Sequence, residues 1–198
     1  MARTGQHRDR LLQAAVRLFR QKGYAATGLS EILSISGAPR GSLYHYFPGG
    51  KEEIGAEAVR SAGRAVEQTL TDLVQSTAGS NEFIIAYTRQ LGDWIAASGY
   101  RDGCPVATTL LETTPRSERI AAAGREVMES WTNAIAVAFR RDGFDEAASR
   151  KQALLLISTI EGALLMARVL RDTVPLAAIV EAFASMAFSN TSTSGTGA

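Results

Sequence analysis

Residues 37–47 place hydrogen-bond donors and apolar side chains at the spacing of a short helix. On a helical wheel of about 100° per residue, the packed side carries Leu43, Tyr46 and Phe47. The opposite side carries Gly41, Tyr44 and His45, with Arg40 at its edge. An arginine at the start of such a helix can bond bidentately to guanine in the major groove of DNA. Arg40 is therefore the best candidate for base recognition, the alternative being a solvated surface arginine.

The residues before this segment predict a second short helix and a sharp turn. Residues 27–36 are suited to a short helix with Thr27 as its N-cap, and Gly37 supplies the left-handed turn that follows. Two short helices joined in this way form a helix-turn-helix, whose second helix enters the major groove. Lys51 follows at the expected start of the next helix, where the helix dipole favours contact with a phosphate. The alternative for Lys51 is a plain surface lysine.

The positive charge of the chain is concentrated in this region. Residues 1–48 carry seven Lys/Arg and two Asp/Glu, a net charge of +5, whereas residues 49–198 carry fourteen and eighteen, a net charge of −4. Both histidines, His7 and His45, also lie in the first part. This distribution favours a polyanion-binding head on a mildly acidic body.

Four motifs follow one another in the first 53 residues: Leu-Phe-Arg-Gln-Lys-Gly-Tyr at 18–24, Thr27, Gly-x-x-Arg-Gly-Ser-Leu-Tyr-x-Tyr-Phe at 37–47, and Lys-Glu-Glu at 51–53. This ordered set resembles the DNA-binding domain of the TetR family of bacterial repressors. The resemblance implies that the DNA contacts are made by Thr27, Arg40, Gly41, Ser42, Tyr44, His45, Tyr46 and Lys51. Pro39 departs from the family pattern, since a Ser or Thr commonly caps the recognition helix, and Gly49-Gly50 makes the next loop one residue longer than in many relatives.

The remaining pattern predicts an all-α protein of about nine helices. Beyond the helix-turn-helix, helices are expected at residues 8–22, 51–77, 81–97, 105–114, 117–140, 145–172 and 175–190. We expect residues 1–50 to form the DNA-binding domain and residues 51–190 to form a domain for ligand binding and dimerisation. Residues 191–198 lack apolar side chains, which predicts a disordered tail.

Composition argues against a membrane protein, a secreted protein and a metalloprotein. The most apolar stretch, residues 152–170, contains Glu161 and Arg168, and the N-terminus lacks the apolar core of a signal peptide. We therefore expect a cytoplasmic protein that does not bind to membranes. The single cysteine, Cys104, excludes an internal disulfide and a multi-cysteine metal site, and no cofactor is expected.

Residues 103–112, Gly-Cys-Pro-Val-Ala-Thr-Thr-Leu-Leu-Glu, resemble the body of a TetR subgroup that includes repressors of multidrug- and flavonoid-responsive genes. This resemblance implies a structural corner beside an effector cavity. The candidate lining residues are Phe83, Tyr87, Trp94, Cys104, Thr108, Glu112, Met128, Trp131, Glu161 and Met166. Core packing explains each apolar member equally well. Glu161 interrupts an apolar helix, so it either faces a cavity or a dimer partner or pairs with an arginine such as Arg168.

The expected function is that of a ligand-responsive repressor that binds a palindromic operator as a homodimer. The last two helices supply apolar faces for the dimer contact, with Leu156, Gly162, Ala163, Ala167, Ala178 and Ala182 as candidate residues. A small apolar or aromatic effector would release the DNA. The alternative is an effector-independent dimeric repressor or a partner-controlled adaptor. An enzyme has little support, because the sequence contains no nucleotide-binding loop, no metal-ligand cluster and no histidine outside the head.

Overall fold

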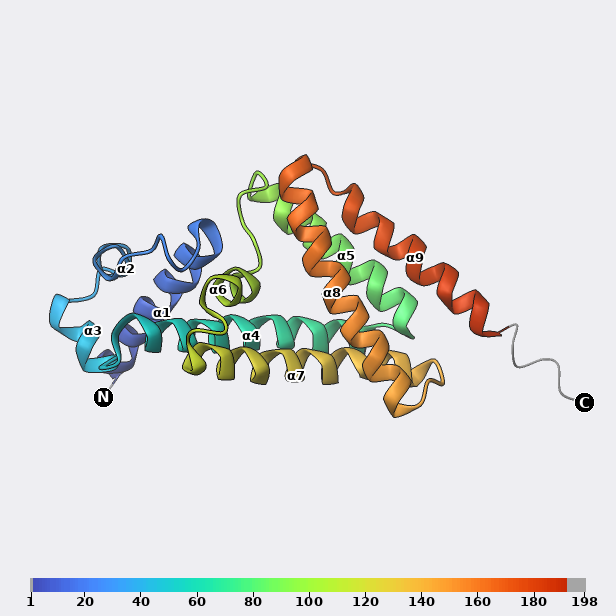
Figure 1. Ribbon diagram of the computed structural model, residues 1–198, viewed down its shortest axis with the longest axis horizontal. Helices are drawn as coiled ribbons and strands as arrows, with labels where there is room; N and C mark the ends of the chain where they lie inside the picture. The colour runs from blue at the N-terminus through green and yellow to red at the C-terminus, as the bar shows by residue number, and fades with distance from the viewer. Residues whose placement is uncertain (1, 192–198) are drawn as a thin grey trace, which may run out of the picture. The chain divides into compact units, whose positions relative to one another are not determined.

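The computed structural model describes residues 2–191, with side-chain surroundings for residues 6–184. Within residues 2–191 the chain forms nine α-helices and no strand, which confirms the predicted all-α class (Figure 1). The helices are α1 Ala2–Lys22, α2 Leu29–Ser36, α3 Arg40–Tyr46, α4 Gly50–Ser76, α5 Ser80–Ala97, α6 Pro105–Thr113, α7 Glu118–Arg141, α8 Glu146–Leu170 and α9 Val174–Thr191. Residues 192–198 of the expected tail lie outside the described residues.

Two helix starts in the head differ from the prediction by more than one residue, and the later helices start within one residue of their predicted positions. α1 begins at Ala2 rather than at Arg8, because the apolar stripe that predicts the helix starts only at Leu11, whereas helical backbone does not require a buried face. The N-cap of α2 is Gly28, so the prediction of Thr27 as the cap is wrong. Thr27 is buried and its hydroxyl donates to the Gly23 carbonyl oxygen at 2.7 Å, which leaves it unable to cap α2.

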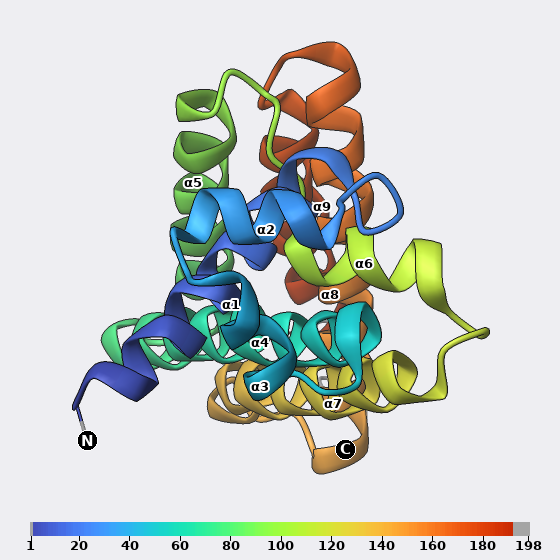
Figure 2. The same cartoon turned by 90° about the vertical axis from the view of Figure 1, so that its left-hand side faces the viewer.

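The first compact unit combines Met1–Gln68 with Gly103–Trp131. Its hydrophobic core is built on one face of α1, where the buried residues are Leu11, Leu12, Ala14, Ala15, Leu18 and Phe19. Ile32 of α2, Leu43 of α3 and the adjoining Phe47 pack against this face. Helices as short as α2 and α3 are not stable alone in water, so they take their conformation from α1. Figure 2 shows the three helices together.

α4 and α7 approach each other closely within this unit. A Cβ at Gly63 of α4 would overlap the methyl groups of Val127 on α7. The indole N–H of Trp131 donates to the Gly63 carbonyl oxygen at 2.9 Å. The close contact therefore requires a residue without a side chain at position 63.

The second compact unit combines Thr69–Asp102 with Thr132–Ala198. Its centre is the packing of α5, α8 and α9. Among the described residues, α8 alone has the length and apolar composition that could cross a membrane. Its buried residues are Ser149, Ala153, Leu156, Ile160, Ala163, Leu164 and Ala167. One apolar face of this helix is therefore buried within the protein, and a second apolar face is exposed.

We predict that Gly63→Ala destabilises the protein by about 1–3 kcal/mol, because the added methyl group overfills the contact with Val127. Gly92→Ala is the matched control, since Gly92 also lies buried inside a helix, but a Cβ there would make only an ordinary van der Waals contact with Thr173 at 3.5 Å. This control should be neutral or stabilising, because alanine is the better helix former. Denaturant unfolding of both variants at one protein concentration measures the difference, and equal stabilities would contradict the packing argument.

Candidate nucleic-acid interface

The two faces of α3 have the character that the helical wheel predicts. Leu43 and Phe47 are buried, whereas the opposite side is exposed and consists of Arg40, Gly41, Tyr44 and His45. Tyr44 is 63% exposed although it is a large aromatic residue. Tyr44 therefore presents its ring and its hydroxyl, which can donate or accept a hydrogen bond, on the exposed side of α3.

Ser42 and Tyr46 have structural partners in and around α3. The N-cap of α3 is Pro39, and the Ser42 hydroxyl donates to the Pro39 carbonyl oxygen at 2.6 Å. Tyr46 is half-buried against the α1 core and meets the His45 ring edge-on, with 4.8 Å between ring centroids. Both residues therefore help to hold α3 and its exposed ring in place.

A groove between α2 and α3 extends this exposed face. It is lined by Leu29, Ser30, Leu33, Ser34, Gly37, Ala38, Arg40, Leu43 and Tyr44. The exposed hydroxyls of Ser30 and Ser34 lie on α2 beside the exposed face of α3. They are absent from the predicted site, and a helical wheel drawn for α2 as well as for α3 could have identified them. The buried Thr27 side chain, by contrast, does not reach the surface, which argues against its predicted role in direct contact.

Lys51 lies at the start of α4 beside the turn from α1 to α2. Its ammonium group donates to the Ala25 carbonyl oxygen at 3.3 Å and sits 4.5 Å from the centroid of the Tyr24 ring. Burial lowers the pKa of Lys51, and the nearby charge of Glu112 opposes that shift. Burial also raises the pKa of Tyr24, with a smaller contribution from Glu52. An ammonium has three donors, so the bond to Ala25 leaves others for a phosphate.

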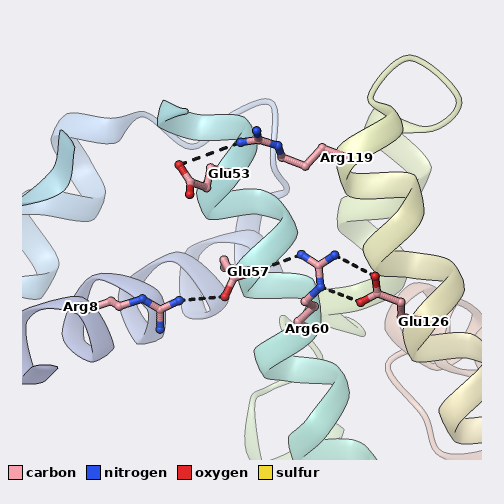
Figure 3. Close-up of polar contacts among 6 residues, drawn as sticks. All are labelled: Arg8, Glu53, Glu57, Arg60, Arg119 and Glu126. Carbon is pink, nitrogen blue, oxygen red and sulfur yellow. Dashed lines mark hydrogen bonds and ion pairs between the residues drawn. The ribbon is translucent and has the colours of Figure 1, made fainter. Parts of the chain in front are cut away.

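Ion pairs join α1, α4 and α7 within the first unit (Figure 3). Arg8 pairs with Glu57 at 2.8 Å, and Glu57 pairs with Arg60 at 3.3 Å. Arg60 also donates two bonds to Glu126, at 2.7 and 3.0 Å, which lowers the pKa of Glu126. Exposed pairs of this kind contribute little individually. In sequence they join the basic α1 to α4 and α4 to α7.

A second set of contacts reinforces the same helices. Arg119 of α7 lies 4.0 Å from the carboxylate of Glu53 on α4. Glu53 in turn accepts a hydrogen bond from the Gly49 amide at 2.7 Å, in the loop that follows α3. The guanidinium of Arg8 lies 5.5 Å from the centroid of the Phe47 ring. The loop between α3 and α4 is therefore held by polar contacts as well as by the apolar core.

The predicted effector-lining residues of the first unit are tied to local structure. Cys104 is the N-cap of α6, and its sulfur accepts from the Ala107 amide at 3.4 Å. The Thr108 hydroxyl donates to the Cys104 carbonyl oxygen at 2.8 Å. Met128 is half-buried and Trp131 is buried on α7. Glu112 is exposed on α6, and its carboxylate accepts from the Ala25 amide, so it is directed to the head and not to an apolar cavity.

In the second unit, the aromatic candidates lie on α5. Phe83 and Tyr87 are buried and stacked, with 5.8 Å between ring centroids, and Trp94 is half-buried. Glu161 is half-buried on α8. Met166 is 50% exposed on the outer face of that helix, which argues against its predicted place in a cavity lining.

The dimer candidates divide between two faces. Gly162, Ala178 and Ala182 are exposed, as an interface between two chains requires. Leu156, Ala163 and Ala167 are buried within the chain, which argues against their predicted role in the dimer contact. The reason is that α8 is apolar on two sides, and a helical wheel does not distinguish the side that packs within the chain from the side that stays exposed. The exposed apolar residues on and beside its outer face are Leu154, Leu155, Leu165, Met166, Val169, Leu170 and Val174.

Known proteins match both halves of the chain. Residues 11–58 match the family model described as bacterial regulatory proteins, tetR family, and residues 81–182 match that of the LmrA/YxaF-like transcriptional regulators, C-terminal domain. The chain is 33% identical over 172 residues to the helix-turn-helix-type transcriptional regulator LmrA of Bacillus subtilis, covering 87% of this chain and 92% of LmrA. It is 34% identical over 117 residues to the transcriptional repressor NemR of Escherichia coli, covering 59% of this chain and 58% of NemR.

A solved structure resembles the chain over a similar extent. The crystal structure of a TetR regulatory protein from Rhodobacter sphaeroides has a TM-score of 0.79 and 26% identity, covering 89% of this chain and 96% of that one. The likeness therefore extends over nearly the whole chain, in sequence and in fold.

Proposed function

This chain belongs to the TetR family of bacterial transcriptional regulators, and we propose that it represses transcription from a palindromic operator until a small apolar or aromatic molecule releases it. The family prediction from the motifs of the head is confirmed, and the relatives are regulators rather than enzymes. The observation that carries the proposal is the exposed donor face of α3 in the basic N-terminal segment. Such a regulator acts on DNA, so we place it in the cytoplasm.

In this proposal, residues of α3 read bases and neighbouring residues contact phosphates. Arg40 is exposed at the start of α3, where a guanidinium reaches the edge of a guanine. Tyr44 and His45 are exposed on the same face, and Gly41 has no side chain to keep the duplex away. Phosphates would be contacted by Lys51 and by the hydroxyls of Ser30 and Ser34. Ser42 and Tyr46 support this surface from behind.

Two heads are needed to read a palindrome, and TetR-family regulators act as dimers. We propose that the interface is the exposed apolar face of α8 and α9. Val169 is 71% exposed and Leu165 is 60% exposed on this face, and Gly162 and Ala178 leave room for close approach of a second helix pair. Removing such a stripe from water favours association of two copies.

The function is tested by sequencing the DNA that the purified full-length chain retains from a random pool of duplexes. We expect two inverted half-sites whose centres lie about one helical turn apart or a multiple of it. Arg40→Ala should weaken binding to the selected duplex by about 1–3 kcal/mol and relax the preference at one base pair of each half-site. Gel shifts on the selected duplex and its single-base variants measure both effects.

Arg89→Ala is the matched control for Arg40→Ala. Arg89 is an exposed arginine of α5, so its loss changes the net charge equally outside the helix-turn-helix. Its binding curve should stay close to that of the unchanged protein. An Arg40→Ala protein with unaltered affinity and preference would show that α3 is docked in a different register.

For the dimer, we predict that Val169→Arg yields monomers, because an unpaired charge in an apolar interface is costly. Leu111→Arg is the control, since Leu111 is 82% exposed on α6 and also apolar. Light scattering should give the monomer mass for Val169→Arg and the dimer mass for the control. If the Val169→Arg protein remains a dimer, the interface lies on another face of the chain.

For the effector, we predict that an apolar aromatic compound quenches tryptophan emission and releases operator DNA over the same concentration range. Both tryptophans, Trp94 and Trp131, lie in the body, and linkage makes the coupling of two sites reciprocal. A coupling of about 5–150-fold in operator affinity is typical of such systems. If no member of a broad aromatic and cationic library changes both signals, the effector-independent repressor becomes the better description.

A further inference from the structure

The turn between α1 and α2 is held by side chains from α4 and α6. The amide of Ala25 in this turn donates to the carboxylate of Glu112, and its carbonyl oxygen accepts from the Lys51 ammonium at 3.3 Å. The amide N–H of Ala25 therefore bonds to a negatively charged group, and its carbonyl oxygen bonds to a positively charged one. Both charged groups bond to the same residue and therefore lie close together, and the charge of Glu112 opposes the lowering of the Lys51 pKa that burial causes. We refer to Ala25, Lys51 and Glu112 as the turn clamp.

The end of α1 is shaped to admit Glu112. Gly23 has a φ of +88°, in the region that favours glycine, and a Cβ at this position would overlap the Glu112 carboxylate. Both the backbone conformation and the close approach therefore require glycine. The carboxylate occupies a defined place against the turn, although its side chain is partly open to solvent.

The same part of the chain also satisfies the last carbonyl groups of α1. The Gly103 amide donates to the Arg20 carbonyl oxygen at 3.2 Å. The Thr108 hydroxyl approaches the Phe19 carbonyl oxygen at 3.4 Å. The last carbonyls of a helix have no partner within the helix, so α6 and the residues before it act as an external cap of α1. Figure 2 shows α6 next to the turn.

We propose that Glu112 is a positioning residue for DNA recognition. Its bond to Ala25 fixes the turn from which α2 and then α3 start, and it does so from α6 without touching the DNA. This inference rests on the proposed DNA-binding function. It also connects α6 to the turn from which α2 starts, because a movement of α6 away from this turn withdraws the acceptor of the Ala25 amide.

The charge of Glu112 makes the positioning role distinguishable from long-range electrostatics. A carboxylate repels the phosphate backbone, so its removal by itself strengthens DNA binding. A positioning role predicts that DNA binding depends on the length of the side chain that carries the acceptor oxygen and not on the charge of that side chain. Two substitutions separate these properties. Glu112→Gln keeps an oxygen acceptor of the same length and loses the charge, whereas Glu112→Asp keeps the charge and shortens the side chain by one methylene group.

The binding test uses the full-length dimer and the duplex that the unchanged protein selects. Loss of a hydrogen bond to a charged group corresponds to about a tenfold loss of affinity or more, which we expect for Glu112→Asp. Glu112→Gln should stay within about twofold of the unchanged protein, or bind more tightly. The salt dependence should keep its slope in both variants, since no phosphate contact is lost. Glu118→Gln, at an exposed glutamate of α7, controls for the change in charge.

Hydrogen exchange at the Ala25 amide supplies a readout that needs no DNA. We expect slow exchange in the unchanged protein and in Glu112→Gln, and faster exchange in Glu112→Asp. If Glu112→Asp binds and exchanges like the unchanged protein, or if Glu112→Gln loses affinity to the same extent, the proposal is overturned. If the unchanged protein selects no DNA sequence, the proposed function fails, and the Ala25 exchange still decides whether the turn clamp exists.

Discussion

The donor face of α3 depends on the apolar face of α1. α2 has eight residues and α3 has seven, and neither length supports a stable isolated helix in water. Their buried residues pack on α1, and each fully buried aliphatic or phenyl side chain contributes about 1.5–3 kcal/mol. The positions of Arg40, Tyr44 and His45 are therefore set by packing on the opposite side of the same short helix. A cavity in that core would displace the surface donors as well as lower the stability.

The helix-turn-helix is completed by residues far away in the sequence. The compact unit that contains it also includes Gly103–Trp131, because α6 caps the end of α1 and α7 packs on α4. The ion pairs from Arg8 through Glu57 and Arg60 to Glu126 follow the same route. The head is thus not a separable block of the first fifty residues in physical terms. The end of α1 and the turn that follows it are held by elements that belong to the body in sequence order.

α8 shows how one helix can serve two sets of neighbours. Its inner face packs against α5 and α9, and its outer face leaves leucine, methionine and valine side chains exposed. An apolar stripe that is partly exposed costs free energy in an isolated chain, and a second copy of the chain can offset that cost. Glu161, half-buried between these faces, shows that the helix is not uniformly apolar.

The sequence by itself determined the fold class, the nine helices of residues 2–191, the helix-turn-helix and the family, because helical periodicity, the turn at Gly37 and the 37–47 motif are local signals. It also determined which side of α3 is exposed, since Leu43 and Phe47 lie on one side of the helical wheel and that apolar side is the one buried in the core. Only the tertiary structure decided which face of α8 lies inside the chain and that Thr27 is buried. It alone directed Glu112 to Ala25, 87 positions away. These outcomes depend on which distant segment packs against a given face, and a single sequence carries no local signal for that choice.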